Sequence, residues 1–376
     1  MRVVRVALGE RSYSILISQG LLSRLGEHCR RTGLGKRCAI ISDVCVAPHF
    51  VKAVMRSLQR GGFDPITLII PAGEKAKSLK TVQHCYDQLA RHRLERASFV
   101  IALGGGVVGD LAGFVAATYL RGIDFVQVPT TLLAQVDSSV GGKVGVNLSA
   151  GKNLVGSFHQ PRLVLCDLDT LKTLPEREFR SGLAEVIKYG VIADGGLFRK
   201  LENEMPRLLR RNQSTLETII ARCCEIKAEV VADDEREGGR RAVLNFGHTI
   251  GHALEATSGY GKFLHGEAIA IGQTAAALLS AQTGLSADDA GRIEALLQRA
   301  GLPTRLRLSA AVRRRLVEAM TLDKKVTAGE GRFVLARKIG DVVWGQKVSQ
   351  AEIIAAFSAL NEVALKNSAV RLGAEE

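Results

Sequence analysis

The first half of this chain alternates short apolar runs with amphipathic segments, and that alternation narrows the possible folds more than any other feature. The apolar runs have the length of buried strands and are bounded by polar or turn-forming residues. We expect strands at 37–42, 66–70, 99–103, 125–128 and 163–166, with helices at 48–60 and 79–92. Strands that alternate with helices form parallel sheets covered on both faces. The pattern therefore predicts an α/β N-terminal domain with a Rossmann-like parallel sheet.

The pattern changes after Pro175, where apolar residues recur at helical spacing. We expect helices at 178–192, 213–232, 249–258, 267–283, 287–300 and 310–320. The sequence thus predicts an α/β domain at 1–174 and a mostly α-helical C-terminal domain at 175–376. A chain of 376 residues is long enough for two such cores.

Composition and charge exclude several classes of protein. The chain carries 51 Lys and Arg against 38 Asp and Glu, a net charge of +13, which suits an anionic partner. Basic residues are dispersed and aromatic residues make up 5%, which disfavours nucleic acid and favours a small anionic substrate. Residues 1–17 lack the apolar core of a signal peptide, and the apolar stretch 268–281 is too short and polar to span a membrane. Seven cysteines without a C-x-x-C pair argue against a disulfide framework. We therefore expect a cytoplasmic enzyme.

A glycine-rich loop follows the expected strand at 99–103. Gly104, Gly106 and Gly109 satisfy G-x-G-x-x-G between a strand and a helix, where backbone N–H groups can bind a pyrophosphate. Two features differ from an ordinary Rossmann unit. The loop does not follow the first strand, and the acidic residue about 20 positions on, Asp124, precedes the next strand instead of ending it. Asp43, after the strand at 37–42, is better placed for a ribose. A turn needed only for packing explains the glycines equally well.

Further polar loops also follow expected strands. The segment 71–78 (PAGEKAKS), the pair Thr130 and Thr131, and the segment 137–143 (DSSVGGK) supply hydroxyl, glycine and lysine donors. Any one of them could be a plain polar loop. Together they indicate a ligand-binding edge at the carboxyl ends of the strands.

Histidines gather in a short part of the helical half. His248 and His252 stand at i and i+4 on one helix face, and His265 follows, so three of the eight histidines fall within eighteen positions. Glu185 lies on another helix beside Lys188. Imidazole and carboxylate are zinc ligands. Spacing alone favours His248 and His252 as a pair, but it does not decide which residues bind the metal. A lone histidine would more simply be a cap or a buried polar contact, and Glu185 with Lys188 could be a surface ion pair.

Taken in order, these motifs resemble those of the 3-dehydroquinate synthases, which belong to the sugar phosphate cyclase superfamily. The resemblance runs from about residue 43 to residue 325, through segments at 71–78, 104–122, 128–143, 151–161, 174–190, 244–255, 265–272 and 322–325. Val144 and Gln273 depart from the pattern, where the family usually has Thr and often Met. Neither stands at a ligand position.

The resemblance implies a zinc site, with cobalt as a substitute, formed by Glu185, His248 and His265, and it moves His252 to the substrate. It implies an NAD-binding domain at 1–174 and a metal- and substrate-binding domain at 175–376. The implied NAD contacts are Asp43, Glu74, Lys77, Gly105, Gly106, Val107, Val108, Gly109, Asp110, Thr130, Thr131, Lys143, Lys152, Thr170, Leu171, Lys172 and Thr173. The implied substrate contacts are Arg121, Asp137, Lys143, Asn153, Lys188, Lys227, Arg241, Asn245, His252, Lys324 and Lys325, with Arg121 reaching from the partner of a homodimer. Catalytic roles are implied for Lys152, Lys188, Arg241, Asn245 and His252.

The implied reaction converts 3-deoxy-D-arabino-heptulosonate 7-phosphate to 3-dehydroquinate and phosphate, a lyase step of the shikimate pathway. No single enzymic base is implied. Another sugar phosphate cyclase is an alternative. The dehydroquinate synthase pattern is favoured by the residues at four substrate positions, Lys227, Arg241, Asn245 and His252. A metal-dependent polyol dehydrogenase would leave the anion-binding lysines unexplained. A basic nucleic-acid binder would explain the charge but not the histidine–glutamate cluster.

Overall fold

The computed structural model describes residues 1–258, 262–306, 309–322 and 332–369. The chain divides into two compact units. The first unit comprises Met1–Phe179 and Arg211–Arg236, and the second comprises Arg180–Arg210 and Glu237–Glu376. The predicted boundary stood at 174/175. In the structure the chain passes from one unit to the other at Phe179, returns at Arg211 and leaves again at Arg236.

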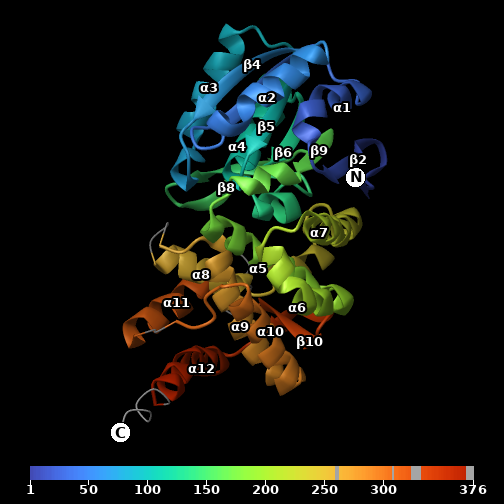
Figure 1. The fold of residues 1–376 in the computed structure, drawn as a ribbon. Coiled ribbons are helices and arrows are strands. Elements are labelled where there is room, and N and C mark those ends of the chain that lie inside the picture. The colour runs from blue at the N-terminus through green and yellow to red at the C-terminus, as the bar shows by residue number, and fades with distance from the viewer. Residues whose placement is uncertain (259–261, 307–308, 323–331, 370–376) are drawn as a thin grey trace. The chain divides into compact units, whose positions relative to one another are not determined.

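A seven-stranded sheet forms the centre of the first unit (Figure 1). Its order is β1-β2-β9-β6-β5-β3-β4, and every pairing is parallel except that of β1 with β2. The strands are β1 (Arg2–Val6), β2 (Tyr13–Ser18), β3 (Arg37–Asp43), β4 (Asp64–Ile70), β5 (Phe99–Gly104), β6 (Asp124–Pro129) and β9 (Leu163–Asp167). The predicted α/β fold with a parallel-dominated sheet is confirmed, and β1 and β2 add to the strands expected.

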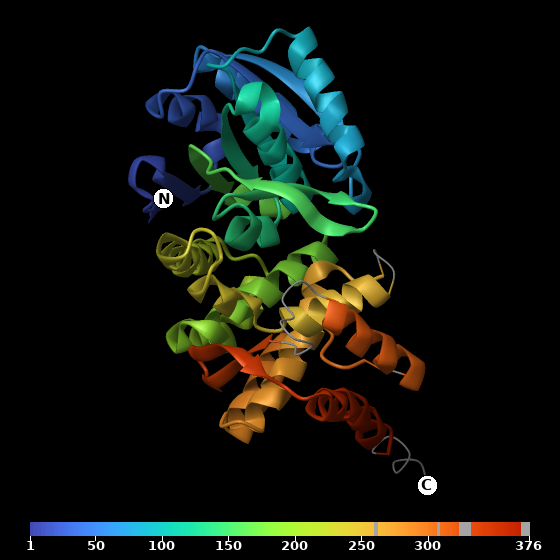
Figure 2. The ribbon, with the colours of Figure 1, turned by 180° about the vertical axis from the view of Figure 1, so that it is seen from behind.

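Helices cover both faces of this sheet, because neighbouring residues of each strand point to opposite sides. Cys38 and Ile40 of β3 pack in one core cluster with α1 (Leu25–Arg31) and α2 (Ala47–Arg60). Ala39 and Ile41 pack in the other with α3 (Leu79–Arg91) and α4 (Gly106–Thr118). Figure 1 shows the face with α2, and Figure 2 shows the opposite face with α3. The continuous apolar run in β3 thus reflects burial on both faces.

Two further pieces complete the first unit. The hairpin of β7 (Lys143–Leu148) and β8 (Gly151–Phe158) was not expected, since its glycines and lysines read as loop. Helix α7 (Gln213–Asp233) packs against β1, β2 and a π-helical turn at Ala134–Ser138. The sequence assigned α7 to the helical half from its position in the chain, whereas its contacts lie in the first unit.

The second unit is mostly helical, as predicted. Its helices are α5 (Glu176–Ile192), α6 (Gly195–Leu209), α8 (His248–Thr257), α9 (His265–Ala281), α10 (Ala287–Arg299), α11 (Ala310–Leu322) and α12 (Gln350–Ala369), with a hairpin of β10 (Arg332–Lys338) and β11 (Asp341–Lys347). Helix α9 is buried along most of its length, and Ile271, Ala275 and Leu279 join the core that α8, α11 and α12 share. In the described part of the chain no helix is long and apolar enough to cross a membrane.

Glycines let α9 approach its neighbours at backbone distance. A Cβ atom on Gly266 would lie 1.9 Å from the carbonyl oxygen of Ser181 in α5. A Cβ atom on Gly272 would lie 2.0 Å from the carbonyl oxygen of Gly247, which precedes α8 and has a φ of +78°. Both glycines are therefore required by packing, and they set the spacing of α5, α8 and α9.

Candidate functional site

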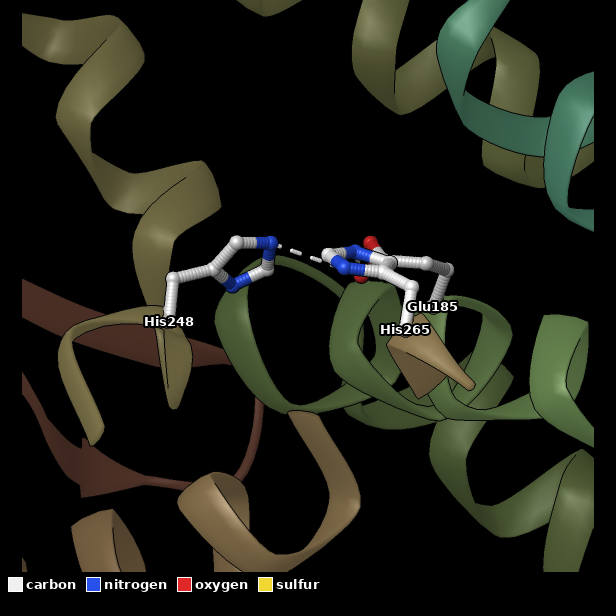
Figure 3. A group of neighbouring side chains, drawn as sticks. All are labelled: Glu185, His248 and His265. Atoms are coloured by element: carbon white, nitrogen blue, oxygen red, sulfur yellow. Dashed lines mark ion pairs between the residues drawn. The ribbon is translucent and has the colours of Figure 1, made fainter. Parts of the chain in front are cut away.

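Three side chains from α5, α8 and α9 converge in the second unit (Figure 3). Glu185 lies within α5, while His248 and His265 are the first residues of α8 and α9. Nε2 of His248 lies 3.5 Å and Nε2 of His265 lies 3.6 Å from Oε1 of Glu185. Glu185 is fully buried, and the side chains of His248 and His265 are 11% and 30% exposed. The group is thus a buried carboxylate facing two imidazoles, with one more open side at His265.

The spacing of these atoms fits a metal ion. Two ligand atoms about 2.1 Å from a tetrahedral zinc lie about 3.4 Å from one another. The two nitrogen–oxygen distances are close to that value and longer than a good hydrogen bond. One ligand atom from each of the three residues lies within 4.8 Å of the others. Two nitrogens and a carboxylate oxygen form a donor set that suits zinc or cobalt, so the residues fit the group that the sequence implied.

The protonation tendencies of the two histidines differ. Burial lowers the pKa of His248 well below its usual value, with the Lys188 ammonium acting in the same direction. Burial also lowers the pKa of His265, but the neighbouring carboxylates of Glu185 and Glu255 outweigh that and raise the pKa to about 10. His248 is therefore held in the neutral form that a metal requires. The carboxylates around His265 favour positive charge there, which a bound cation would supply.

Lys188 is buried beside Glu185. Its ammonium group pairs with Oε2 of Glu185, and the two side chains are 1% and 0% exposed. A surface ion pair, which spacing allowed, is therefore excluded. Arg241 is also buried, on the short helix Arg240–Asn245 that ends at Asn245. The ring of His252 lies 5.2 Å from that of His248 and 6.0 Å from that of His265. His252 therefore lies beside the group, and it is not one of the three residues that form it.

In the first unit, strand order identifies the ligand-binding edge. The chain builds β3 and β4 in one direction, crosses back to β5 beside β3, and continues through β6 to β9 in the other. Ligands of open α/β sheets bind at such a reversal, outside the carboxyl ends of the strands. Here the reversal separates β3, which ends at Asp43, from β5, which ends at Gly104. This explains why the glycine loop lies so far from the N-terminus.

Polar contacts join the loops at this edge. The buried ammonium group of Lys77 pairs with Asp110 at the start of α4 and contacts Oδ1 of Asn153 at 2.5 Å. Burial raises the pKa of the Asp110 carboxyl, and the Lys77 ammonium opposes that. Asn147 donates to Glu74 at 2.7 Å and accepts from the backbone N–H of Asn153 at 2.9 Å. The 71–78 loop, α4 and the β7–β8 hairpin are thus held together.

The glycines of the loop after β5 are closely packed, and a buried hydroxyl lies at the same edge of the sheet. A Cβ atom on Gly104 would lie 2.6 Å from Val108, and one on Gly109 would lie 2.9 Å from Gln127, so packing explains both. Gly105 is the N-cap of α4 and has no side chain that could accept from the N–H groups of the first turn, where residues 105–107 are partly buried. The hydroxyl of Thr130 is buried and has no hydrogen-bond partner among the described residues. A ligand hydroxyl or phosphate oxygen at this edge would satisfy it.

The remaining predicted residues lie in several settings. Asp43 accepts from the backbone N–H groups of Cys45 and Val46, which turns the chain into α2. Asp137 bonds Lys227 of α7 at 2.5 Å. Thr131 Oγ1 accepts from Ala134 N. The other positions are the partly buried Gly106, Val107 and Lys152, the buried Val108, the exposed Lys143 and Arg121, and Thr170, Leu171, Lys172 and Thr173 in the turn after β9. Lys324 and Lys325 lie outside the described residues.

Several contributors were missed by sequence reasoning. Asn147 lies outside the segments that resemble the family, and Gln135 and Glu255 lie within them but had no role assigned; their contacts reveal all three. Gln135 donates to the carbonyl groups of Pro129 and Asp167 and to the hydroxyl of Thr170, which fixes the π-helical turn that carries Asp137. π-Helical turns are frequent at functional sites, but the sequence gives no signal for them.

The seven cysteines, all within the described residues, differ in accessibility. Cys45 is exposed, and the other six are buried. Burial raises the pKa of Cys29, Cys85 and Cys224 to about 12. Those three thiols are therefore inert at neutral pH.

Known proteins resemble this chain in sequence over nearly its whole length. Residues 67–181 match the 3-dehydroquinate synthase N-terminal family, and residues 182–326 match the 3-dehydroquinate synthase C-terminal family. The 3-dehydroquinate synthase of Desulforamulus reducens is 50% identical over 359 residues, 95% of this chain and 100% of that protein. That of Pelobacter propionicus is 53% identical over 345 residues, 91% of this chain and 95% of that protein.

Solved structures share the fold. A 2-deoxy-scyllo-inosose synthase complexed with carbaglucose-6-phosphate, NAD⁺ and Co²⁺ aligns with a TM-score of 0.87 at 26% identity, covering 96% of this chain and 100% of that one. A 2-epi-5-epi-valiolone synthase from Streptomyces hygroscopicus, with NAD⁺ and Zn²⁺ bound, gives 0.85 at 30% identity, covering 96% and 99%. A glycerol dehydrogenase from Schizosaccharomyces pombe gives 0.68 at 16% identity, covering 96% and 92%, which shows the fold alone.

The shared fold, the histidine–carboxylate group and the likeness to the inosose and valiolone synthases place the chain in the class of the sugar phosphate cyclases. Within that class the matches over residues 67–326, and identities near 50% along whole relatives, are decisive. The chain belongs to the 3-dehydroquinate synthase family.

Proposed function

We propose that this protein is a 3-dehydroquinate synthase, a carbon–oxygen lyase that converts 3-deoxy-D-arabino-heptulosonate 7-phosphate to 3-dehydroquinate and inorganic phosphate. The observation that carries the proposal is 50–53% identity over 91–95% of the chain to proteins of that name. The inosose and valiolone synthases, at 26% and 30% identity, support the same class but are more distant. The reaction belongs to the shikimate pathway, and we place it in the cytoplasm.

The two units take different parts in this proposal. The edge around Asp43, Glu74, Lys77 and the 105–110 loop binds NAD, and Glu185, His248 and His265 hold a divalent metal, zinc or cobalt. When bound, the nucleotide accepts and returns a hydride while the metal polarises substrate oxygens as a Lewis acid. Neutral His248 is ready to ligate without first losing a proton. Buried Lys188 balances the charge of Glu185 and supplies a donor beside it.

Basic side chains bind the anionic groups of the substrate. The substrate carries a carboxylate and a phosphate, which arginine binds in bidentate fashion and lysine binds as a point charge. We assign this role to Lys152, Lys188, Lys227 and Arg241. Asn245 and His252 contact substrate hydroxyls, and Asp137 holds the ammonium group of Lys227 in place. Arg121 acts from the partner of a homodimer, which light scattering of the purified protein can test.

Phosphate release tests the proposed function directly. Purified protein given the heptulosonate phosphate should release phosphate only when both NAD⁺ and a divalent metal are present. A chelator should stop the release, and added Zn²⁺ or Co²⁺ should restore it. No NADH should accumulate, because the overall reaction involves no net oxidation. Steady accumulation of NADH would instead indicate a dehydrogenase, and release that is independent of NAD⁺ would contradict the proposal.

Lys152 offers a more specific test. We expect Lys152→Ala to raise the KM for the heptulosonate phosphate about 10- to 100-fold, because a charge-assisted hydrogen bond contributes about 1.5–3 kcal/mol. Steady-state kinetics should be compared with those of Lys52→Ala, which removes an exposed lysine of α2. Equal KM values for the two variants would refute the role of Lys152.

A further inference from the structure

Both histidines of the Glu185 group have an oxygen acceptor behind the ring. Nδ1 of His248 donates to the backbone carbonyl of Phe246 at 3.1 Å. Nδ1 of His265 lies 3.3 Å from Oε2 of Glu255, a carboxylate on α8. An acceptor at Nδ1 places the proton on that nitrogen and leaves the lone pair on Nε2. The Nε2 atom of each ring faces Glu185, where it would bind a metal that displaces any proton on it.

The two acceptors differ in how they are held. Phe246 is two residues from His248, so the chain itself keeps its carbonyl close. Glu255 is ten residues from His265 and belongs to another helix. The distance between Glu255 and His265 depends on how α8 packs on α9. The two helices approach closely, since a Cβ atom on Gly251 would lie 3.2 Å from the carbonyl oxygen of Ala268. The backbones of the two helices thus fix where the Glu255 carboxylate meets the His265 ring.

His265 needs such an anchor more than the other two members of the group do. Its side chain is 30% exposed, against 11% for His248 and 0% for Glu185. Packing therefore restricts its rotamer least. Glu255 is itself only 11% exposed, so its carboxylate is well placed to fix the ring.

We propose that Glu255 is a positioning residue that orients His265 for metal binding and strengthens the site through its negative charge. The inference rests on the metal site of the proposed function. Glu255 follows His248 by seven residues and His252 by three, so it lies on the same face of α8. One helix face thus supplies a ligand and the group that orients a second ligand. Removal of such outer-shell partners weakens metal binding by about 10–100-fold.

An alternative role for Glu255 is direct ligation. His252, Glu255 and His265 also offer one ligand atom each within 4.8 Å of one another. An ion held there would use Nδ1 of His265, the nitrogen that faces Glu255, instead of Nε2. The number of ions bound per chain distinguishes the two roles.

The test uses metal-free full-length protein and the variants Glu255→Gln and Glu255→Ala. Zn²⁺ affinity is measured by competition with a chromophoric chelator, and the visible absorption of the Co²⁺-loaded protein reports ligand geometry. We expect about a 10-fold loss of affinity for the glutamine variant, which keeps the size of the side chain, and up to about 100-fold for alanine. The Co²⁺ spectrum of the alanine variant should also change.

Glu202→Gln is the matched control. Glu202 forms a two-point ion pair with Arg292 at 3.0 and 2.8 Å in the same unit, apart from the histidines. It should lower the melting temperature without changing Zn²⁺ affinity. Wild-type affinity and an unchanged Co²⁺ spectrum in Glu255→Ala would overturn the proposal. So would two ions in the wild type and one in that variant, since Glu255 would then be a ligand. A wild-type protein that binds no metal would instead refute the proposed function.

Discussion

His248→Ala is expected to abolish metal binding and to reduce turnover by at least about 1,000-fold. In the proposed site the imidazole of His248 supplies one of three ligand atoms, and its Nε2 lies 3.5 Å from Oε1 of Glu185. Without it the site has two ligands, and a catalytic metal worth several kcal/mol to the transition state is lost. Metal content after gel filtration and the phosphate-release rate measure the two effects. The fold should persist, because the ring is replaced by a smaller apolar group at the first residue of α8.

Glu185 requires a more careful substitution than His248. Glu185→Ala should abolish activity as well, but it also leaves the buried ammonium group of Lys188 without its carboxylate partner. Breaking a buried pair in this way costs about 3–5 kcal/mol. Circular dichroism should therefore accompany the activity measurement for Glu185→Ala.

For His248→Ala, the control for loss of an imidazole is His84→Ala, at an exposed position of α3. Full turnover of metal-free His248→Ala would falsify the metal assignment.

Gly266→Ala is expected to have the second largest effect, although it changes no ligand. Its Cβ atom would lie 1.9 Å from the carbonyl oxygen of Ser181 and 2.8 Å from the Ser181 Cα atom. These are backbone atoms, so α9 must move away from α5. Overpacking of this kind costs about 1–3 kcal/mol, which lowers the melting temperature by about 2–10 °C. Because His265 begins α9 and Glu185 lies in α5, the shift should also weaken metal binding.

Gly291→Ala is the matched control for Gly266→Ala. Gly291 lies in α10, and a Cβ atom there would meet nothing within 4 Å. The substitution should stabilise the protein by about 0.5–1 kcal/mol, because alanine is the better helix former. Thermal unfolding and Zn²⁺ competition on both variants separate the two positions. Equal stability and equal affinity in Gly266→Ala and the wild type would show that α9 can repack.

The fold was predictable where the sequence pattern has a physical cause within a single element. Strands such as β3 and β5 are apolar because both faces are buried, and they were found from that property alone. Helix α6 was missed because Gly195, Gly196 and Pro206 disrupt its pattern. The β7–β8 hairpin was missed because its glycines, required for close strand contact, look like loop. The packing of α7 on β1 depends on contacts distant in sequence, which periodicity does not encode.

Spacing predicted the chemistry of the site, whereas the set Glu185, His248 and His265 came only from the resemblance to the family. Spacing favoured His248 and His252, because neighbours on a helix face are visible in a sequence. His265 comes from another helix, and only the three-dimensional packing brings it within 3.6 Å of Glu185. Glu255 and Gly266 follow the same rule. Glu255 matters through its contact with His265, and Gly266 through its contact with Ser181. Neither contact can be read from the sequence.

The distribution of thiols has a practical consequence for spectroscopy. Cys45 is exposed, whereas the other six cysteines are buried. Its backbone N–H bonds the Asp43 carboxylate, at the edge of the sheet where the strand order reverses. A thiol-reactive fluorophore can therefore be attached beside the proposed nucleotide edge of the unmodified protein, with no engineered cysteine. Such a label would report the arrival of a nucleotide as a change in emission, independently of turnover.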